Sequence, residues 1–282
     1  MKRMTYAAAL VEGLDHAMAE NDRIIVVSGH LLGLGPHRTL MAPLEHKYHD
    51  RFIEPPNAEA ALAGLGAGAA MAGDRPLVNF STANFTYLAW SQIANDAGVV
   101  HHMTDGAVDV PVVFYAMHGV RGGGAAQHNA SPQGMLWNCP GLEIVLPSSP
   151  ADAKGLIGTA FRSNNPTVFL THAKLLGTEG PVPDGVHEIP LGQAEIKRAG
   201  RDVTVIATSY MVVLALAAAE TLAGEASRSR WSIRARWCRS TRRRSWRRSA
   251  VPGAPSWWTN ATCAAARPPR LPPPSASTRS MR

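Results

Sequence analysis

A single carboxylate, Glu59, opens a helix that the sequence builds almost wholly from alanine, glycine, leucine and methionine. Because the stretch 59–73 has no polar face, we expect this helix to be buried on most sides. Its glycines weaken the helix, so they are better explained by the close approach of another backbone. Burial would raise the pKa of Glu59 and suit it to proton transfer. The alternative is an acid that only stabilises the first helical turn.

A second candidate site is the glycine-rich loop 122–124, which leads to Gln127 and His128. The loop follows an apolar run at 110–115, which we expect to be a strand. Such a loop can bring backbone N–H groups and one imidazole to a small ligand. The alternative is a flexible turn that carries a surface histidine.

Two other patterns are weaker. The stretch 64–69 matches the loose dinucleotide pattern G-x-G-x-x-A, but it lies within a helix instead of directly after a strand, so we reject that interpretation. The pair His101-His102 has no acid or cysteine at ligand spacing, so the sequence does not indicate a metal site there.

Strands and helices alternate along the chain. We expect helices over 6–20, 59–73, 86–100 and 150–162, and strands over 23–27, 52–53, 76–80, 110–115, 142–146 and 167–170. Solidly apolar strands that alternate with helices predict an α/β fold, a parallel sheet with helices on both faces. Ligands of such sheets bind at the carboxyl ends of the strands. Glu59, Phe85 and the loop 122–128 all lie just past expected strand ends.

The chain divides into segments of unlike composition. Residues 1–176 are expected to form the first domain, and the proline- and glycine-containing stretch 177–194 a linker. Residues 195–225 are expected to form the start of a second α/β domain. The body 1–225 holds all 21 acidic residues and 14 of the 28 basic residues, whereas 226–282 holds 14 arginines and no acid. The net charge of +7 is therefore the sum of an acidic body and a basic C-terminal segment.

The segment 226–282 is rich in arginine, tryptophan, serine and proline. Taken at face value it is a disordered basic arm, which could bind nucleic acid. A frameshift in a GC-rich gene explains this composition better. Back-translated and read one base earlier, 229–234 becomes VEVVDP, an ordinary strand-like sequence. We therefore interpret 226–282 as a frameshift product, and nucleic-acid binding as the least favoured function.

Other features of the sequence indicate where in the cell the protein is expected. No apolar run reaches the 18 residues of a membrane span, and the first residues lack the apolar core of a signal peptide. The body contains one cysteine, Cys139, so no disulfide framework is predicted and a cytoplasmic location is expected.

Over residues 4–225 the chain resembles the beta subunits of thiamine-diphosphate-dependent 2-oxo acid dehydrogenases. This group includes the pyruvate, branched-chain and acetoin dehydrogenases and is related to transketolase. The matching motifs are Met4-Thr5-Tyr6, Glu59 with its Gly/Ala helix, Arg75-Pro76, Asn84-Phe85, Gln92-Ile93-Ala94-Asn95, Ala126-Gln127-His128, Pro140-Gly141-Leu142, Ala151 to Ile157 and Asn164-Asn165-Pro166. The shifted-frame peptide also looks like the C-terminal domain of this family.

The resemblance implies that thiamine diphosphate lies between this chain and an alpha subunit, which holds the diphosphate and its magnesium. Glu59 would hydrogen-bond the pyrimidine ring and favour its imino tautomer. Phe85 would stack on that ring, and Gln127 would also bind the cofactor. His128 would face the substrate as a catalytic group, alongside Glu59.

The resemblance also implies a potassium ion, held mostly by backbone oxygens of Val112, Ala160, Phe161, Ser163 and Asn165. The expected assembly is an α2β2 heterotetramer that docks on a lipoyl acyltransferase core, with no membrane contact. Its reaction would be oxidative decarboxylation of a pyruvate-like 2-oxo acid, with acyl transfer to lipoyl groups. Alternatives are an acetoin-cleaving dehydrogenase and an inactive, truncated pyrimidine-domain remnant.

Two stretches depart from the family. Ser28-Gly29-His30 lacks the acid that usually follows the first strand, which puts proton communication between paired sites in question. Tyr115-Ala116-Met117-His118 replaces the usual Arg-Gly-Pro stretch, which points to an unusual substrate.

Overall fold

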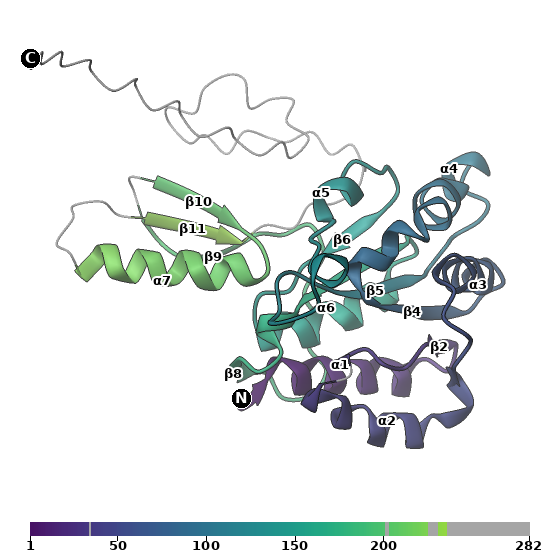
Figure 1. The fold of residues 1–282 in the computed structure, drawn as a ribbon, viewed down its shortest axis with the longest axis horizontal. Coiled ribbons are helices and arrows are strands. Elements are labelled where there is room, and N and C mark those ends of the chain that lie inside the picture. The colour runs from purple at the N-terminus through teal and green to yellow at the C-terminus, as the bar shows by residue number, and fades with distance from the viewer. Residues whose placement is uncertain (34, 201–202, 225–230, 236–282) are drawn as a thin grey trace, which may run out of the picture. The chain divides into compact units, whose positions relative to one another are not determined.

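The computed structural model describes residues 1–33, 35–200, 203–224 and 231–235 (Figure 1). Its helices are α1 (Tyr6–Glu20), α2 (Ala42–Lys47), α3 (Glu59–Met71), α4 (Val100–Met103), α5 (Gln133–Leu136), α6 (Pro150–Arg162) and α7 (Tyr210–Gly224). Its strands are β1 (Lys2–Thr5), β2 (Ile24–Val27), β3 (Phe52–Ile53), β4 (Arg75–Thr82), β5 (Val113–His118), β6 (Glu143–Val145), β7 (Thr167–His172), β8 (Glu179–Val182), β9 (Glu195–Arg198), β10 (Val203–Ala207) and β11 (Trp231–Ala235). None of the helices in these ranges is long and apolar enough to cross a membrane.

The main sheet has six strands in the order β3-β2-β4-β5-β7-β6, and every neighbouring pair is parallel. All carboxyl ends of its strands therefore lie along one edge. The predicted parallel α/β fold is confirmed.

Alternate residues of the central strands supply two cores, one on each face of the main sheet. Tyr115 joins a cluster with Leu10 of α1 and Leu156 of α6, whereas Phe114 joins another with Leu62 of α3. β5 and β7 are buried along their whole length. This is the burial pattern expected of a parallel sheet covered on both sides.

The helices that flank this sheet begin where the local chemistry predicts. The Thr5 hydroxyl accepts a hydrogen bond from the Ala8 N–H at the start of α1. Ser149 does the same for the Asp152 N–H at the start of α6, where Pro150 occupies the first helical position. The bounds predicted for these two helices are confirmed.

Three expectations about local structure need correction. The helix expected over 86–100 is a 3-10 turn η3 (Ala83–Tyr87), a π-helical segment η4 (Ser91–Ala97) and the short α4. The strand expected from residue 110 begins at Val113, because Pro111 has no N–H to donate to the sheet. The linker 177–194 contains β8, which pairs antiparallel with β1.

A second, three-stranded sheet has the order β10-β11-β9 and is accompanied by α7. β11 pairs parallel with β10 and antiparallel with β9. Its residues, Trp231–Ala235, belong to the segment 226–282 that we expected to be disordered, and that prediction is wrong for these residues because their backbone completes the sheet. The rest of 226–282 lies outside the described residues.

Candidate functional site

The candidate site residues lie along the carboxyl edge of the main sheet. Glu59 is the first residue of α3, which follows β3. Phe85 lies in η3, directly after β4, and His128 ends the 3-10 turn η5 (Ala126–His128) in the connection after β5. The position of these residues past strand ends agrees with the general location of ligand sites in parallel sheets.

The structure brings Phe85 and His128 together. Their rings meet edge to face, with 5.4 Å between centroids. Asn84 holds the two segments in place, because its side-chain amide donates to the Ala126 carbonyl (3.2 Å) and its side-chain oxygen accepts from the Ala130 N–H (2.8 Å). Asn84 was recognised from sequence only as part of a motif, and its role as a clamp depends on tertiary contacts.

The glycine-rich loop before His128 adopts an unusual backbone. Gly123 and Gly124 have φ of 81° and 84°, and Ala125 has φ of 46°. A left-handed alanine is strained, and such strain persists only where surrounding contacts hold it. Here the Asn129 side-chain amide donates to the carbonyls of Gly123 (3.1 Å) and Ala125 (2.6 Å). The loop is therefore held in shape, which argues against the alternative of a flexible turn.

The hydrogen bond of His128 indicates which of its ring nitrogens is free. Nδ1 lies 3.1 Å from the carbonyl oxygen of Gly124, which can only accept. The neutral ring must therefore carry its hydrogen on Nδ1, which leaves the lone pair of Nε2 available to a ligand.

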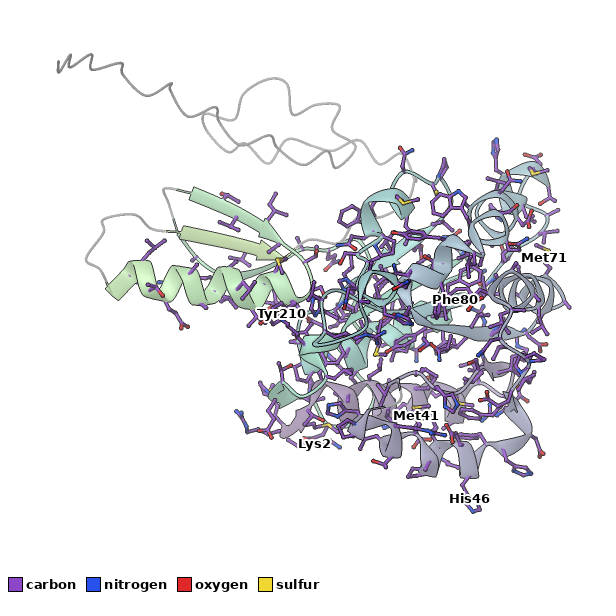
Figure 2. The ribbon with its side chains drawn as sticks, in the orientation of Figure 1. Lys2, Met41, His46, Met71, Phe80 and Tyr210 are labelled. Atoms are coloured by element: carbon purple, nitrogen blue, oxygen red, sulfur yellow. The ribbon has the colours of Figure 1, made fainter. Side chains whose placement is uncertain are left out.

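Helix α3 is less buried than the sequence predicted. Gly66 is a true close-approach glycine, because a Cβ there would lie 2.2 Å from Cγ2 of Val78. On the other face Leu65 is 42% exposed, and a Cβ on Gly68 would meet no atom within 4 Å. Figure 2 places Met71, at the end of α3, on the outside of the molecule and Phe80 inside it.

The prediction of a helix buried on most sides is therefore wrong for this chain by itself, since only one face of α3 meets the sheet and η4. The Glu59 side chain is only partly buried, and Gln127 is exposed. Strand β2 separates the strand preceding Glu59 from the strand preceding Phe85. The chain thus presents Glu59 on the same sheet edge as the Phe85–His128 pair, but does not enclose it.

Two carboxylates from other elements lie beside the segment 28–30, which has no acid of its own. A Cβ on Gly29 would lie 2.8 Å from a carboxylate oxygen of Glu54 and 3.1 Å from one of Glu45. The Gly29 N–H donates to the same Glu54 oxygen at 2.5 Å. Sequence reasoning missed this arrangement; the one available signal was that Glu54 follows a strand expected to lie in the same sheet.

The second departure from the family places His118 in the interior. Its Nδ1 lies 3.3 Å from the Ser131 hydroxyl and its Nε2 3.1 Å from the Ser209 hydroxyl. Burial lowers the pKa of His118 to about 3, and the neighbouring His172 acts in the same direction. His118 is therefore a neutral, hydrogen-bonded group at neutral pH.

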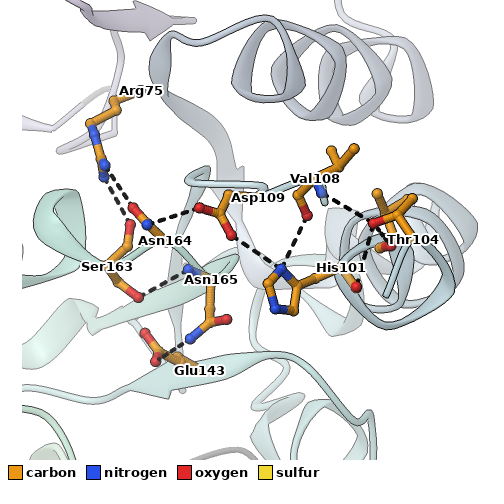
Figure 3. A network of polar contacts seen from close by, with 10 residues as sticks. Arg75, His101, Thr104, Val108, Asp109, Glu143, Ser163, Asn164 and Asn165 are labelled. Atoms are coloured by element: carbon orange, nitrogen blue, oxygen red, sulfur yellow. Dashed lines mark hydrogen bonds and ion pairs between the residues drawn. The ribbon is translucent and has the colours of Figure 1, made fainter. Parts of the chain in front are cut away.

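The oxygens expected to bind potassium already have hydrogen-bond partners (Figure 3). Nη1 of Arg75 donates to the carbonyls of Phe161 (2.6 Å) and Ser163 (2.9 Å), and Nη2 donates to Oδ1 of Asn164 (2.7 Å). The carbonyls of Val112 and Ala160 accept backbone N–H groups, and the carbonyl of Asn165 accepts the Thr167 hydroxyl (3.5 Å). A potassium ion would have to share two oxygens with a guanidinium, which like-charge repulsion opposes. The described residues do not fit the ion in this arrangement.

Comparison with known protein families shows to which family the chain belongs. Residues 2–178 match the model of the transketolase pyrimidine binding domain. The chain belongs to this family. Residues 192–238 match the model of the transketolase C-terminal domain. This second match covers the small sheet and continues past residue 225.

Curated relatives narrow the family further. The chain is 38% identical over 227 residues to the mitochondrial pyruvate dehydrogenase E1 component subunit beta of Drosophila melanogaster, covering 79% of this chain and 62% of the relative. It is 35% identical over 238 residues to the acetoin:2,6-dichlorophenolindophenol oxidoreductase subunit beta of Cupriavidus necator, covering 79% and 69%. The predicted resemblance to this group of beta subunits is confirmed. The chain spans less than two thirds of the length of the fly relative.

Solved structures support the fold alone. A split-gene transketolase described as an inactive beta4 tetramer superposes with a TM-score of 0.66 at 22% identity, covering 82% of this chain and 70% of that one.

Proposed function

We propose that this chain is the beta-type subunit of a thiamine-diphosphate-dependent 2-oxo acid dehydrogenase. Its reaction would be oxidative decarboxylation of a pyruvate-like 2-oxo acid with acyl transfer to lipoyl groups. The observation that carries the proposal is the Phe85–His128 pair, clamped by Asn84 at the sheet edge that also bears Glu59. The curated relatives agree with it, since they are named as pyruvate dehydrogenase and acetoin oxidoreductase beta subunits.

Three side chains would divide the work at this edge. Phe85 offers an aromatic face to the pyrimidine of the cofactor, and Glu59 offers a carboxylate to a ring nitrogen. Gln127 lies exposed beside His128 and completes the cofactor-binding set. His128 presents Nε2 to the substrate, where it would take or return a proton. The cofactor, when bound, would supply the carbanion chemistry that no side chain provides.

An alpha-type partner would complete the site. Gly64, Leu65 and Gly68 form an open face of α3, the helix that Glu59 begins. A partner that packs against these glycines and also covers the first turn of α3 would bury Glu59. We infer that this partner carries the diphosphate and magnesium site, that the assembly is an α2β2 heterotetramer, and that it docks on a lipoyl acyltransferase core.

The test is reconstitution with an alpha-type subunit from the same genome. We expect copurification, and pyruvate-dependent reduction of 2,6-dichlorophenolindophenol only when thiamine diphosphate and magnesium are present. Glu59→Gln should lower kcat at least about 100-fold, because an amide cannot hold or release the proton. Glu20→Gln, an exposed acid on α1, is the matched control and should retain full activity. Absence of any cofactor-dependent turnover with a copurifying partner would overturn the proposal.

Other predictions remain open to direct measurement. The frameshift interpretation is tested by resequencing the codons for residues 221–230, where one missing or added base would be found. If the frame is intact, the alternative of an inactive remnant is favoured.

Binding of potassium is tested by comparing the melting temperatures of the chain in KCl and NaCl at equal ionic strength. The expected cytoplasmic location is tested by cell fractionation.

A further inference from the structure

Arg121 is a fixed cation in the loop that leads to His128. Its backbone N–H donates to the side-chain oxygen of Asn129 (3.0 Å), and its Nη2 donates to the hydroxyl of Thr82 (2.7 Å). The Thr82 hydroxyl in turn donates to the carbonyl of His128 (3.4 Å). The backbone and the side chain of Arg121 are therefore both tethered to segments that hold His128.

The side chains of Arg121 and His128 both approach Gly124. A Cβ on Gly124 would be 3.0 Å from the Cβ of His128 and 3.7 Å from Nε of Arg121. Because both atoms lie close to the same point, Nε of Arg121 is within about 7 Å of the Cβ of His128. Any ligand that reaches the His128 ring, which contacts Phe85, lies within range of the positive charge of Arg121.

Arg121 has unused hydrogen-bonding capacity. Among the residues that the structure describes, it takes part in no ion pair. Within the described part of the chain its Nη2 has a hydrogen-bond partner and its Nε and Nη1 have none, and the residue is partly exposed. Holding the loop needs only one neutral donor to Thr82, so this contact does not account for the charge or for the remaining N–H groups.

We propose that Arg121 binds the carboxylate of the substrate, so that the site selects a 2-oxo acid over a neutral hydroxyketone such as acetoin. The inference rests on the proposed function and identifies the substrate class of that same site. A guanidinium is planar and can donate two parallel N–H groups to a carboxylate, which gives both charge and orientation. Acetoin carries no charge and would gain nothing from Arg121.

Arg121 acts in binding more than in the chemical step. The carboxylate loses its negative charge as carbon dioxide departs, so Arg121 stabilises the bound substrate at least as well as the transition state. Removing Arg121 should therefore raise KM for pyruvate by roughly 10- to 100-fold, the usual range for a charged hydrogen bond, with a smaller change in kcat. Arg121→Lys keeps the positive charge but loses the two parallel N–H donors, so it should give an intermediate KM.

Binding can be measured on the full chain without turnover. Arginine Nε–H resonances would be recorded by NMR spectroscopy during titration with pyruvate and with acetoin at constant ionic strength. The Arg121 signal would be assigned from its loss in Arg121→Gln. We expect pyruvate to shift this signal saturably and acetoin to leave it in place. The proposal is overturned if pyruvate causes no saturable shift, or if acetoin causes the same one.

Kinetics of the reconstituted complex provide the second readout. Arg121→Gln should raise KM for pyruvate, whereas Arg23→Gln, at the opposite edge of the sheet, should not. Equal turnover of acetoin and pyruvate by the unmodified complex, or an unchanged KM in Arg121→Gln, would overturn the role of Arg121. Absence of turnover with either compound would instead reject the proposed function, and the resonance shifts would still decide whether Arg121 binds a carboxylate.

Discussion

The two sheets of this chain are covered very differently. In the six-stranded sheet, β5 and β7 are buried from end to end, because α1 and α6 cover one face and α3 and η4 the other. In the three-stranded sheet, Ile196 and Ile206 are 54% and 45% exposed. Its helix α7 is apolar almost throughout, and Met211 and Leu214 are about half exposed.

This difference follows the way the strands pair. A parallel sheet requires cover on both faces, which the described residues give to the larger sheet, whereas the three-stranded sheet is mixed and leaves apolar side chains exposed. Cover for Ile206 and α7 would have to come from residues outside the described ranges or from another chain. All candidate site residues lie on the covered sheet, so the site depends on the part whose core the described residues supply.

The largest expected effect comes from the same substitution made in each region. Leu10→Ala on α1 should lower the free energy of unfolding by about 2–5 kcal/mol, because it leaves a cavity in a closed core. Leu214→Ala on α7 should change it by less than about 1 kcal/mol, since this side chain is 46% exposed. Urea unfolding followed by circular dichroism measures both. Equal losses would show that α7 is covered in solution.

A smaller contrast lies within α3. Gly66→Ala should destabilise the chain by about 1–3 kcal/mol, because its Cβ would collide with Val78. Gly68→Ala should stabilise it by about 0.5–1 kcal/mol, since alanine favours the helix and meets no neighbour. Thermal unfolding of the isolated chain measures both changes.

Gly68→Ala also tests whether the open face of α3 contacts the alpha-type subunit. Gly68→Ala should weaken copurification with the alpha-type subunit even though it stabilises the chain, because the added methyl group would block a closely packed helix. Unimpaired assembly would show that the partner does not approach α3 at this glycine.

The smallest of these expected contrasts is the pH dependence contributed by His118. The pKa of this imidazole is about 3 in the folded chain, whereas an unfolded histidine titrates near 6.5. Between these values the unfolded state binds more protons, so stability is full above about pH 6.5 and falls as the pH is lowered toward 3. Between pH 7.5 and 5.5 this group should cost about 1.4 kcal/mol.

His118→Gln provides the control, because it removes the titrating group and keeps an amide for Ser131 and Ser209. Urea unfolding at the two pH values should then show a loss smaller by about the same amount. An unchanged pH dependence would mean that His118 is not buried in its neutral form.

The sequence by itself determined the local elements and the class of the fold. The starts of α1 and α6 follow from Thr5, Ser149 and Pro150, whose effects reach only the first turn of each helix. The continuous apolar strands required a sheet buried on both faces, and so a parallel one. The same local motifs, among them Glu59, Asn84-Phe85 and Ala126-Gln127-His128, were enough to place the chain in its family.

Only the tertiary structure decided which of these residues meet. The Phe85–His128 contact, the carboxylates beside Gly29 and the tether of Arg121 to Thr82 each join segments at least 16 residues apart in the chain. Such contacts depend on strand order and loop closure, which no local pattern specifies. For the same reason the exposure of α3 could not be predicted, because an apolar helix has the same sequence whether its outer face is covered by its own chain or left for a partner.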